Sequence, residues 1–173
     1  MSEERGYVQV YTGNGKGKTT AALGISLRAI CAGKKVYFGQ FVKGMKYSEL
    51  KTPELLDNFK MQQFGQDKFI FNNPEEEDYR LAKEALLKIK NILQSGEYDL
   101  VVLDEANIAM YYNLFSPCDL IDILENRNPK VEVIITGRYA KDEIIEFADL
   151  VTEMKEIKHY YKKGVKARCG IEN

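Results

Sequence analysis

Short apolar runs, separated by stretches with helical periodicity, set the strongest limit on how this chain can fold. Two of them, LVVL at 100–103 and VIIT at 133–136, do not alternate between apolar and polar residues. Such continuous runs are typical of parallel strands that helices cover on both faces. The sequence predicts five strands, at residues 7–12, 35–41, 99–104, 131–136 and 149–154.

Helical patterns lie between these expected strands. The clearest covers residues 73–96, where Asn73 is a suitable cap, Pro74 suits the first helical position, Glu76 falls at a capping-box position and Gly96 is a suitable end. Its expected apolar stripe consists of Ala82, Ala85, Ile89 and Ile92. A helix ending near Gly33 is expected to bury Leu23, Leu27 and Ile30, and shorter helices are expected at 118–127 and 140–148.

Length and composition narrow the class of protein. A chain of 173 residues favours a single domain, here 1–173. With 25 basic and 26 acidic residues, the net charge of −1 gives no reason to expect a nucleic-acid or membrane partner. Three scattered cysteines predict reduced thiols, and the sequence has no apolar run of membrane-spanning length and no signal-peptide core at its start. We therefore expect a cytoplasmic protein.

A glycine-rich stretch, TGNGKGKTT at 12–20, lies between the first expected strand and the first expected helix. This context is the one that a phosphate-binding P-loop requires, because backbone N–H groups and a helix N-terminus then surround an anion. Lys18 would place an ammonium on the phosphates, and the Thr19 hydroxyl would hold Mg²⁺. Thr12 stands where the usual pattern requires glycine. The alternatives are a ligand-free turn and a dinucleotide fingerprint, which fits worse because Lys18 stands at its third glycine.

Strands that alternate with helices, together with this loop, predict the fold class. We expect an α/β, P-loop NTPase-like (RecA-like) three-layer fold with a mostly parallel central sheet and helices on both faces. Ligands in such sheets bind beyond the carboxyl ends of the strands. The loops that follow Thr12, Phe41, Asp104 and Thr136 are therefore the places to look for a site.

A second signal comes from DLVVLDEAN, an apolar strand that ends in Asp104 and Glu105. In P-loop enzymes an acid at such a strand end helps to hold Mg²⁺, although acids here also cap helices. The single histidine, His159, lies in the basic segment 155–173, and no motif for a general base is evident. This pattern favours a reaction whose nucleophile arrives already activated, so that the protein supplies position and charge.

The chain closely resembles the P-loop class of ATP:corrinoid adenosyltransferases. The matching segments are, in order, YTGNGKGKTTAALG, GQFVKG, DLVVLDE, ITGR, ADLVTEM and IKHYYKKGVKARCGIEN. The closing GVKA…GI is more specific to the family than the P-loop, and the family's own loop also begins with threonine. The resemblance implies that Co(I) of a corrinoid attacks the 5′-carbon of ATP and expels triphosphate.

Site residues follow from this resemblance by position. Glu105 would bind Mg²⁺ (or Mn²⁺) with Thr19 and with Asp104 beside it, and Arg138 in ITGR would reach the phosphates. Arg28 matches an ATP-contacting arginine, although a solvated helix surface explains it as well. Lys18, Glu105 and Arg138 would be the catalytic residues. The expected triphosphate-binding residues are Asn14, Gly15, Lys16, Gly17, Lys18, Thr19, Thr20, Arg28 and Arg138.

Fewer residues of the sequence match the family's corrinoid-binding positions. Phe69 and Phe71 match aromatic positions that approach the lower face of the corrin in the family, and core packing of a short strand explains them equally well. Lys43, in QFVKG, would contact a ligand or be a solvated loop lysine. The resemblance further implies ATP and a reduced corrinoid as substrates, a flavoprotein reductase as electron donor, a homodimer, and the segment 155–173 near the active site.

Two other functions compete with this reading. A P-loop NTPase or small-molecule kinase would release phosphate or ADP. A non-catalytic nucleotide-binding module would have less use for the acid pair and for Arg138, which together suit the stabilisation of a leaving group.

Overall fold

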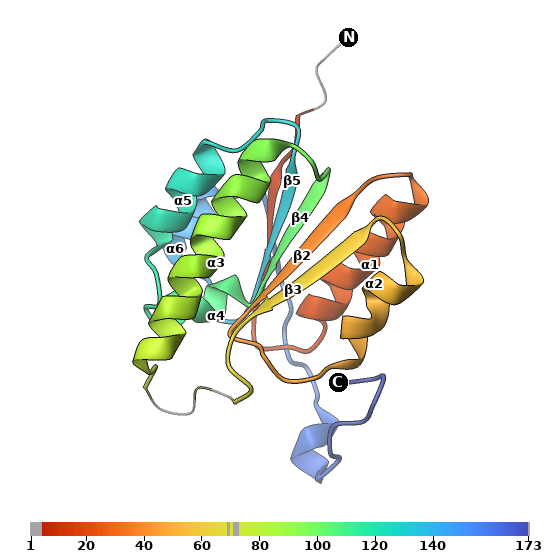
Figure 1. Cartoon of the computed structure of the whole chain (residues 1–173). Helices are drawn as coiled ribbons and strands as arrows, with labels where there is room; N and C mark the ends of the chain where they lie inside the picture. The colour runs from red at the N-terminus through yellow and green to blue at the C-terminus, as the bar shows by residue number, and fades with distance from the viewer. Residues whose placement is uncertain (1–4, 69, 71–72, 173) are drawn as a thin grey trace.

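A single parallel sheet forms the centre of the molecule. The computed structural model describes residues 5–68, 70 and 73–172. Its six strands are all parallel, in the order β3-β2-β4-β5-β1-β6, and helices cover both faces (Figure 1). The predicted three-layer α/β architecture is therefore confirmed. The strands are β1 (Val8–Thr12), β2 (Val36–Phe41), β3 (Phe59–Phe64), β4 (Leu100–Asp104), β5 (Glu132–Thr136) and β6 (Leu150–Glu153).

The helices divide between the two faces of the sheet. Figure 1 shows α1 and α2 on one face and α3, α4, α5 and α6 on the other. No helix in the described part of the chain is both long and apolar enough to span a bilayer. The helices are α1 (Lys18–Cys31), α2 (Thr52–Leu55), α3 (Glu76–Ser95), α4 (Ala106–Tyr111), α5 (Pro117–Glu125) and α6 (Asp142–Phe147), with 3₁₀ turns η1 (Ser48–Lys51) and η2 (Tyr160–Lys163).

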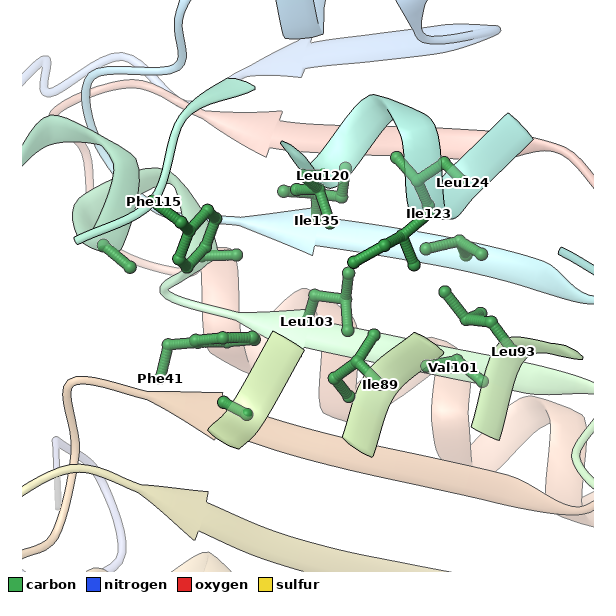
Figure 2. Packing of buried hydrophobic residues seen from close by; sticks show 14 of the residues in the cluster. Phe41, Ile89, Leu93, Val101, Leu103, Phe115, Leu120, Ile123, Leu124 and Ile135 are labelled. Carbon is green, nitrogen blue, oxygen red and sulfur yellow. The ribbon is translucent and has the colours of Figure 1, made fainter. Parts of the chain in front are cut away.

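The larger core lies between the sheet and the helices α3 to α6. Ile89 and Leu93 of α3 pack toward Val101 and Leu103 of β4, and Leu120 of α5 closes the same layer (Figure 2). These side chains are buried, and fully burying one such side chain stabilises a fold by about 1.5–3 kcal/mol. The packing holds β4 at the centre of the sheet, so its last residue has a fixed position.

The sequence analysis did not anticipate strand β3, helices α2 and α4, or the 3₁₀ turns η1 and η2. Strand β3 has the sequence FKMQQF, whose polar residues weaken the apolar signal, and it pairs only with β2 at one edge of the sheet. Helix α4 has six residues, too few for helical periodicity to be visible. The five predicted strands are present, with ends that differ by at most one residue.

The first turn of α3 corrects one prediction. The N-cap is Glu75, not Asn73, and a capping box joins it reciprocally to Asp78. The helix accordingly starts at Glu76. Its buried stripe ends with Leu93, while Ile92 is only partly buried. A capping box requires only an acceptor at each of two positions three residues apart, and a glutamate followed by an aspartate meets that requirement here.

The buried face of α1 is also different from the one predicted. Ala22 and Ser26 are fully buried, whereas Leu27 is 50% exposed. The Ser26 hydroxyl is satisfied by donating to the carbonyl of Ala22 (2.7 Å). Small residues on this face bring the helix close to the sheet, so the larger Leu23 and Ile30 pack along its flanks. The helix begins directly at Lys18, which matters for the site described next.

Candidate active site

A cavity of about 720 Å³ lies at the carboxyl edge of the sheet. The loops after β1, β2, β4 and β5 contribute to its wall, as sheets of this kind lead one to expect. Residues of the C-terminal segment, His159 and 170–172, complete the wall, and this segment extends past the strand ends (Figure 1). Segments far apart in the sequence thus line one cavity.

The glycine-rich loop joins β1 to α1 in a conformation that needs glycine. Gly13 and Gly17 have φ of 97° and 118°, in the left-handed region that side chains disfavour. A Cβ at Gly15 would lie 2.7 Å from the carbonyl oxygen of Met154, and the Gly15 N–H donates to that same oxygen (2.7 Å). Thr12, at the position where the common pattern has glycine, accepts a bond from the Ala140 N–H (3.3 Å).

Lys18 is held at the centre of this loop. Its Nζ donates to the carbonyl oxygens of Gly13 (2.9 Å) and Gly15 (2.7 Å). Burial lowers the pKa of Lys18; Arg138 lowers it further, while Glu105 and Asp104 oppose the shift. Because neutral carbonyls are its bonding partners, the ammonium keeps its charge available for an anion in the loop.

Asp104, at the end of β4, is fully buried and accepts four hydrogen bonds. Its Oδ1 accepts from the hydroxyls of Thr19 (2.8 Å) and Thr136 (2.6 Å). Its Oδ2 accepts from Gln40 Nε2 (3.2 Å) and Lys43 Nζ (2.8 Å). A carboxylate has about four acceptor positions, so protein donors occupy all of them. This geometry makes Asp104 an organiser of its neighbours.

Glu105 is the member of the acid pair that faces the cavity. It adopts φ of 59°, and its N–H donates to the Thr136 hydroxyl oxygen (3.0 Å). Burial raises the pKa of Glu105, and the charge of Asp104 adds to the rise, while Lys43, Lys18 and Arg138 oppose it. The left-handed backbone turns consecutive acids apart, so that one is buried in the sheet and the other lines the wall.

The residues present suit a magnesium ion. The Thr19 hydroxyl gives its proton to Asp104, which leaves its oxygen lone pairs for a cation. In the described ranges no group of three or more His, Cys, Asp or Glu residues could hold a metal. A site with one hydroxyl and one carboxylate is typical of Mg²⁺, which keeps several waters and takes further oxygens from substrate phosphates.

The other expected site residues are placed unevenly. Thr20, Lys43 and Arg138 line the cavity with the glycine loop, as does Lys16, whose Nζ donates to the carbonyl of Ile171 (3.0 Å). Asn14 is outside the cavity wall, and its Oδ1 accepts from the N–H of Glu156 (3.1 Å).

Another expected contact among the described residues, Arg28, is likewise not brought to the cavity. Arg28 is exposed in the last turn of α1 and does not line the wall, because the helix carries it away from Lys18. Phe69 and Phe71 lie outside the described residues.

Sequence reasoning missed several polar residues of the site, among them Gln40, Thr136 and Glu49. Gln40 is fully buried, and its Nε2 lies 3.3 Å from a carboxylate oxygen of Glu49 on η1. Gln40 lies in QFVKG and Thr136 in ITGR, so both were inside segments already singled out. Strand-end position was the available signal, since a polar residue that closes an apolar strand points to the loops where ligands bind.

The C-terminal segment is anchored at several points. Directly before the segment, the Met154 N–H donates to the carbonyl of Thr12 (2.8 Å), and the Lys16 side chain reaches the carbonyl of Ile171 within it (3.0 Å). Within the segment, Glu172 accepts from the Arg168 side chain (3.0 Å) and from the Tyr160 hydroxyl. These two bonds, the Arg168 one being the stronger influence, lower the pKa of Glu172 to about 2. His159 uses Nδ1 to accept from the Tyr161 N–H (3.1 Å), a bond that shapes η2.

Almost the whole chain is similar in sequence to known proteins. The family model described as ATP:corrinoid adenosyltransferase BtuR/CobO/CobP matches residues 4–173. A corrinoid adenosyltransferase of Sinorhizobium sp is 35% identical over 175 residues, which cover 99% of this chain and 82% of the relative. Those of Escherichia coli K12 and Salmonella typhimurium, the latter called CobA, are each 37% identical over 174 residues, covering 98% of this chain and 87% of the relative.

Proposed function

This chain belongs to the ATP:corrinoid adenosyltransferase family, and on that premise we propose that it transfers the 5′-deoxyadenosyl group of ATP to the Co(I) of a corrinoid. A cobalt–carbon bond forms at the 5′-carbon, the carbon–oxygen bond to the triphosphate breaks, and triphosphate leaves with that electron pair. Cobalt supplies the two electrons of the new bond and becomes formally Co(III). The product is an adenosylcorrinoid.

One observation carries the proposal: the cavity gathers the cationic side chains of Lys18, Lys43 and Arg138 around a P-loop. Lys18, Arg138 and residues of the glycine loop line the same cavity as Glu105. The single histidine uses its Nδ1 in a structural bond. A nucleophile that is already reduced needs no proton removed, so stabilising the departing charge is the protein's main task.

The chain's own residues would divide the work as follows. The glycine loop and Lys18 bind the triphosphate, and Arg138 approaches it from β5 with several donors in a fixed fork. Thr19 and Glu105 would hold Mg²⁺ or Mn²⁺, whose charge helps to neutralise the leaving group. Asp104 fixes the Thr19 hydroxyl from behind, so it acts by orientation. Arg28 is left out of this division because it does not line the cavity.

The remaining parts of the proposal rest on the family. We assign the lower face of the corrinoid to Phe69 and Phe71 on the sequence match alone. A flavoprotein reductase would supply electrons to cobalt, and two copies of the chain would form a homodimer in the cytoplasm. Residues 155–173 are proposed to remain near the reacting atoms, and the cavity wall formed by His159 and 170–172 supports this.

An anaerobic assay tests the function directly. Purified protein is mixed with MgATP and chemically reduced cob(I)alamin, and the corrinoid spectrum and the phosphate product are both recorded. Light-sensitive adenosylcobalamin with an equal amount of triphosphate is the expected result. ADP or phosphate with an unchanged corrinoid spectrum would overturn the proposal in favour of an NTPase or kinase. If neither kind of product formed, the protein would be a non-catalytic nucleotide-binding module.

A further inference from the structure

Lys43 occupies an unusual position in the cavity wall. Its ammonium forms an ion pair with Oδ2 of Asp104 at 2.8 Å and lies 5.4 Å from the ring centre of Tyr47. The side chain of Lys43 is 15% exposed, and that of Asp104 is fully buried. A lysine in solvent would be free to move, whereas this one is held at a single point beside the cavity.

The backbone around Lys43 is built to hold it there. Val42, directly before it, has φ of 49°, a genuine outlier for a β-branched residue. Gly44 lies against the loop after β3, where a Cβ would come within 2.4 Å of Gln66 backbone atoms. A Cβ on Gly65 would come equally close to the backbone nitrogen of Lys43. Backbone strain of this kind persists only where the surroundings impose it, and it concentrates at functional sites.

Asp104 connects Lys43 to the P-loop. One oxygen of the carboxylate accepts from Lys43, and the other accepts from Thr19. The Lys43 ammonium and the Thr19 hydroxyl thus bind to the two oxygens of one carboxylate. The lysine therefore lies at the metal and triphosphate end of the cavity, a placement that the sequence match, which gave it a corrinoid role, did not indicate.

We propose that Lys43 is a triphosphate-binding residue, a second ammonium that Asp104 holds ready for the leaving group. The proposal rests on the proposed function, since it assigns Lys43 to the ATP side of that reaction. Lys18 would neutralise charge from within the loop and Lys43 from the loop after β2. Gln40 supports the arrangement, because its amide donates to the same Asp104 oxygen and accepts from Gln63 (3.1 Å).

The test measures binding of inorganic tripolyphosphate, with Mg²⁺, by calorimetry to the wild type and to Lys43→Met. Lys46→Met is the matched control, because it removes the same charge from an exposed position of the same loop. Binding of cob(II)alamin is measured separately with all three proteins. Lys43→Met should weaken tripolyphosphate binding about 10- to 100-fold, the range for a lost hydrogen bond to a charged group. Lys46→Met should change it less than twofold, and corrinoid binding should stay unchanged.

Two outcomes would overturn the proposal. Weaker corrinoid binding with unchanged tripolyphosphate binding would return Lys43 to the corrinoid side. No change in either would make it only the counter-ion of Asp104. If Lys43→Met does not fold, acetylation of Lys43 in the wild type is followed by mass spectrometry, and tripolyphosphate but not cob(II)alamin should protect it. Wild-type adenosyl transfer is assayed in parallel, so that failure of the function is recognised independently.

Discussion

The hydroxyl of Thr19 donates a 2.8 Å hydrogen bond to Oδ1 of Asp104, although 85 positions separate the two residues in the chain. Thr19 is in the first turn of α1, and Asp104 is the last residue of β4. The bond fixes the rotation of the hydroxyl, so its lone pairs have one direction in which to meet a cation. Several expected effects of substitution follow from this relationship and from its neighbours.

Thr19→Ala should lower kcat about 10²- to 10³-fold, the usual cost of removing one preorganised group that stabilises transition-state charge. Thr19→Ser keeps the hydroxyl and its bond to Asp104, so it should retain most of the rate. The two variants are compared by titrating Mg²⁺ in the adenosyl-transfer assay. Equal losses in both would show that the methyl group, and not the oxygen, is what matters.

Lys18→Ala should reduce kcat/KM for ATP by at least about 100-fold, because it removes the ammonium from the centre of the loop. Lys34→Ala is the control, since it removes an exposed charge near the other end of α1. The measurement is steady-state kinetics with ATP varied at saturating corrinoid. A Lys18→Ala enzyme with near wild-type kinetics would refute the assignment of the loop.

The neighbouring acids should respond differently to loss of charge. Glu105→Gln removes the carboxylate that faces the cavity, so the Mg²⁺ concentration for half-maximal rate should rise about tenfold or more. An unchanged Mg²⁺ titration would remove Glu105 from the metal site.

Asp104→Asn should act mainly on folding. The change leaves the buried Lys43 ammonium without its anion and puts an NH₂ donor where one carboxylate oxygen accepted two of the four hydrogen bonds. Breaking a buried ion pair from one side costs about 3–5 kcal/mol of unfolding free energy. Urea unfolding of the two acid variants checks this difference, and a larger loss of stability in Glu105→Gln would contradict it.

The C-terminal segment provides a prediction about pH. Arg168 and Tyr160 hold the pKa of Glu172 at about 2, below its value in an unfolded chain. The contribution of Glu172 to stability is therefore fully present above the unfolded pKa of about 4.3 and is lost progressively as the pH falls from there through about 2. The carboxyl carbon signal of Glu172 in NMR should stay constant from pH 7 to 4. In Arg168→Met the pKa of Glu172 should rise. A wild-type titration midpoint near 4.3 would show that the contacts of Glu172 with Arg168 and Tyr160 do not form.

Local patterns carried most of what could be predicted about the fold. Continuous apolar runs specified parallel strands, and glycines with two lysines before a helix specified a P-loop, because both depend on residues close together in the chain. Strand β3 was not predicted because an edge strand needs less apolar surface. The predicted buried face of α1 was wrong because the small residues Ala22 and Ser26 let the helix approach the sheet closely, which size-based reasoning did not anticipate.

The sequence by itself determined the class of fold, the family and the residue types available for binding a triphosphate. Only the tertiary structure decided that Asp104 accepts four hydrogen bonds from protein donors while Glu105 faces the cavity. It also brought Lys43 to the other side of the same carboxylate as Thr19 and left Arg28 outside. The physical reason is that side-chain direction at strand ends depends on the strained backbone turns at Val42 and Glu105, which arise from packing between distant segments and leave no local pattern in the sequence.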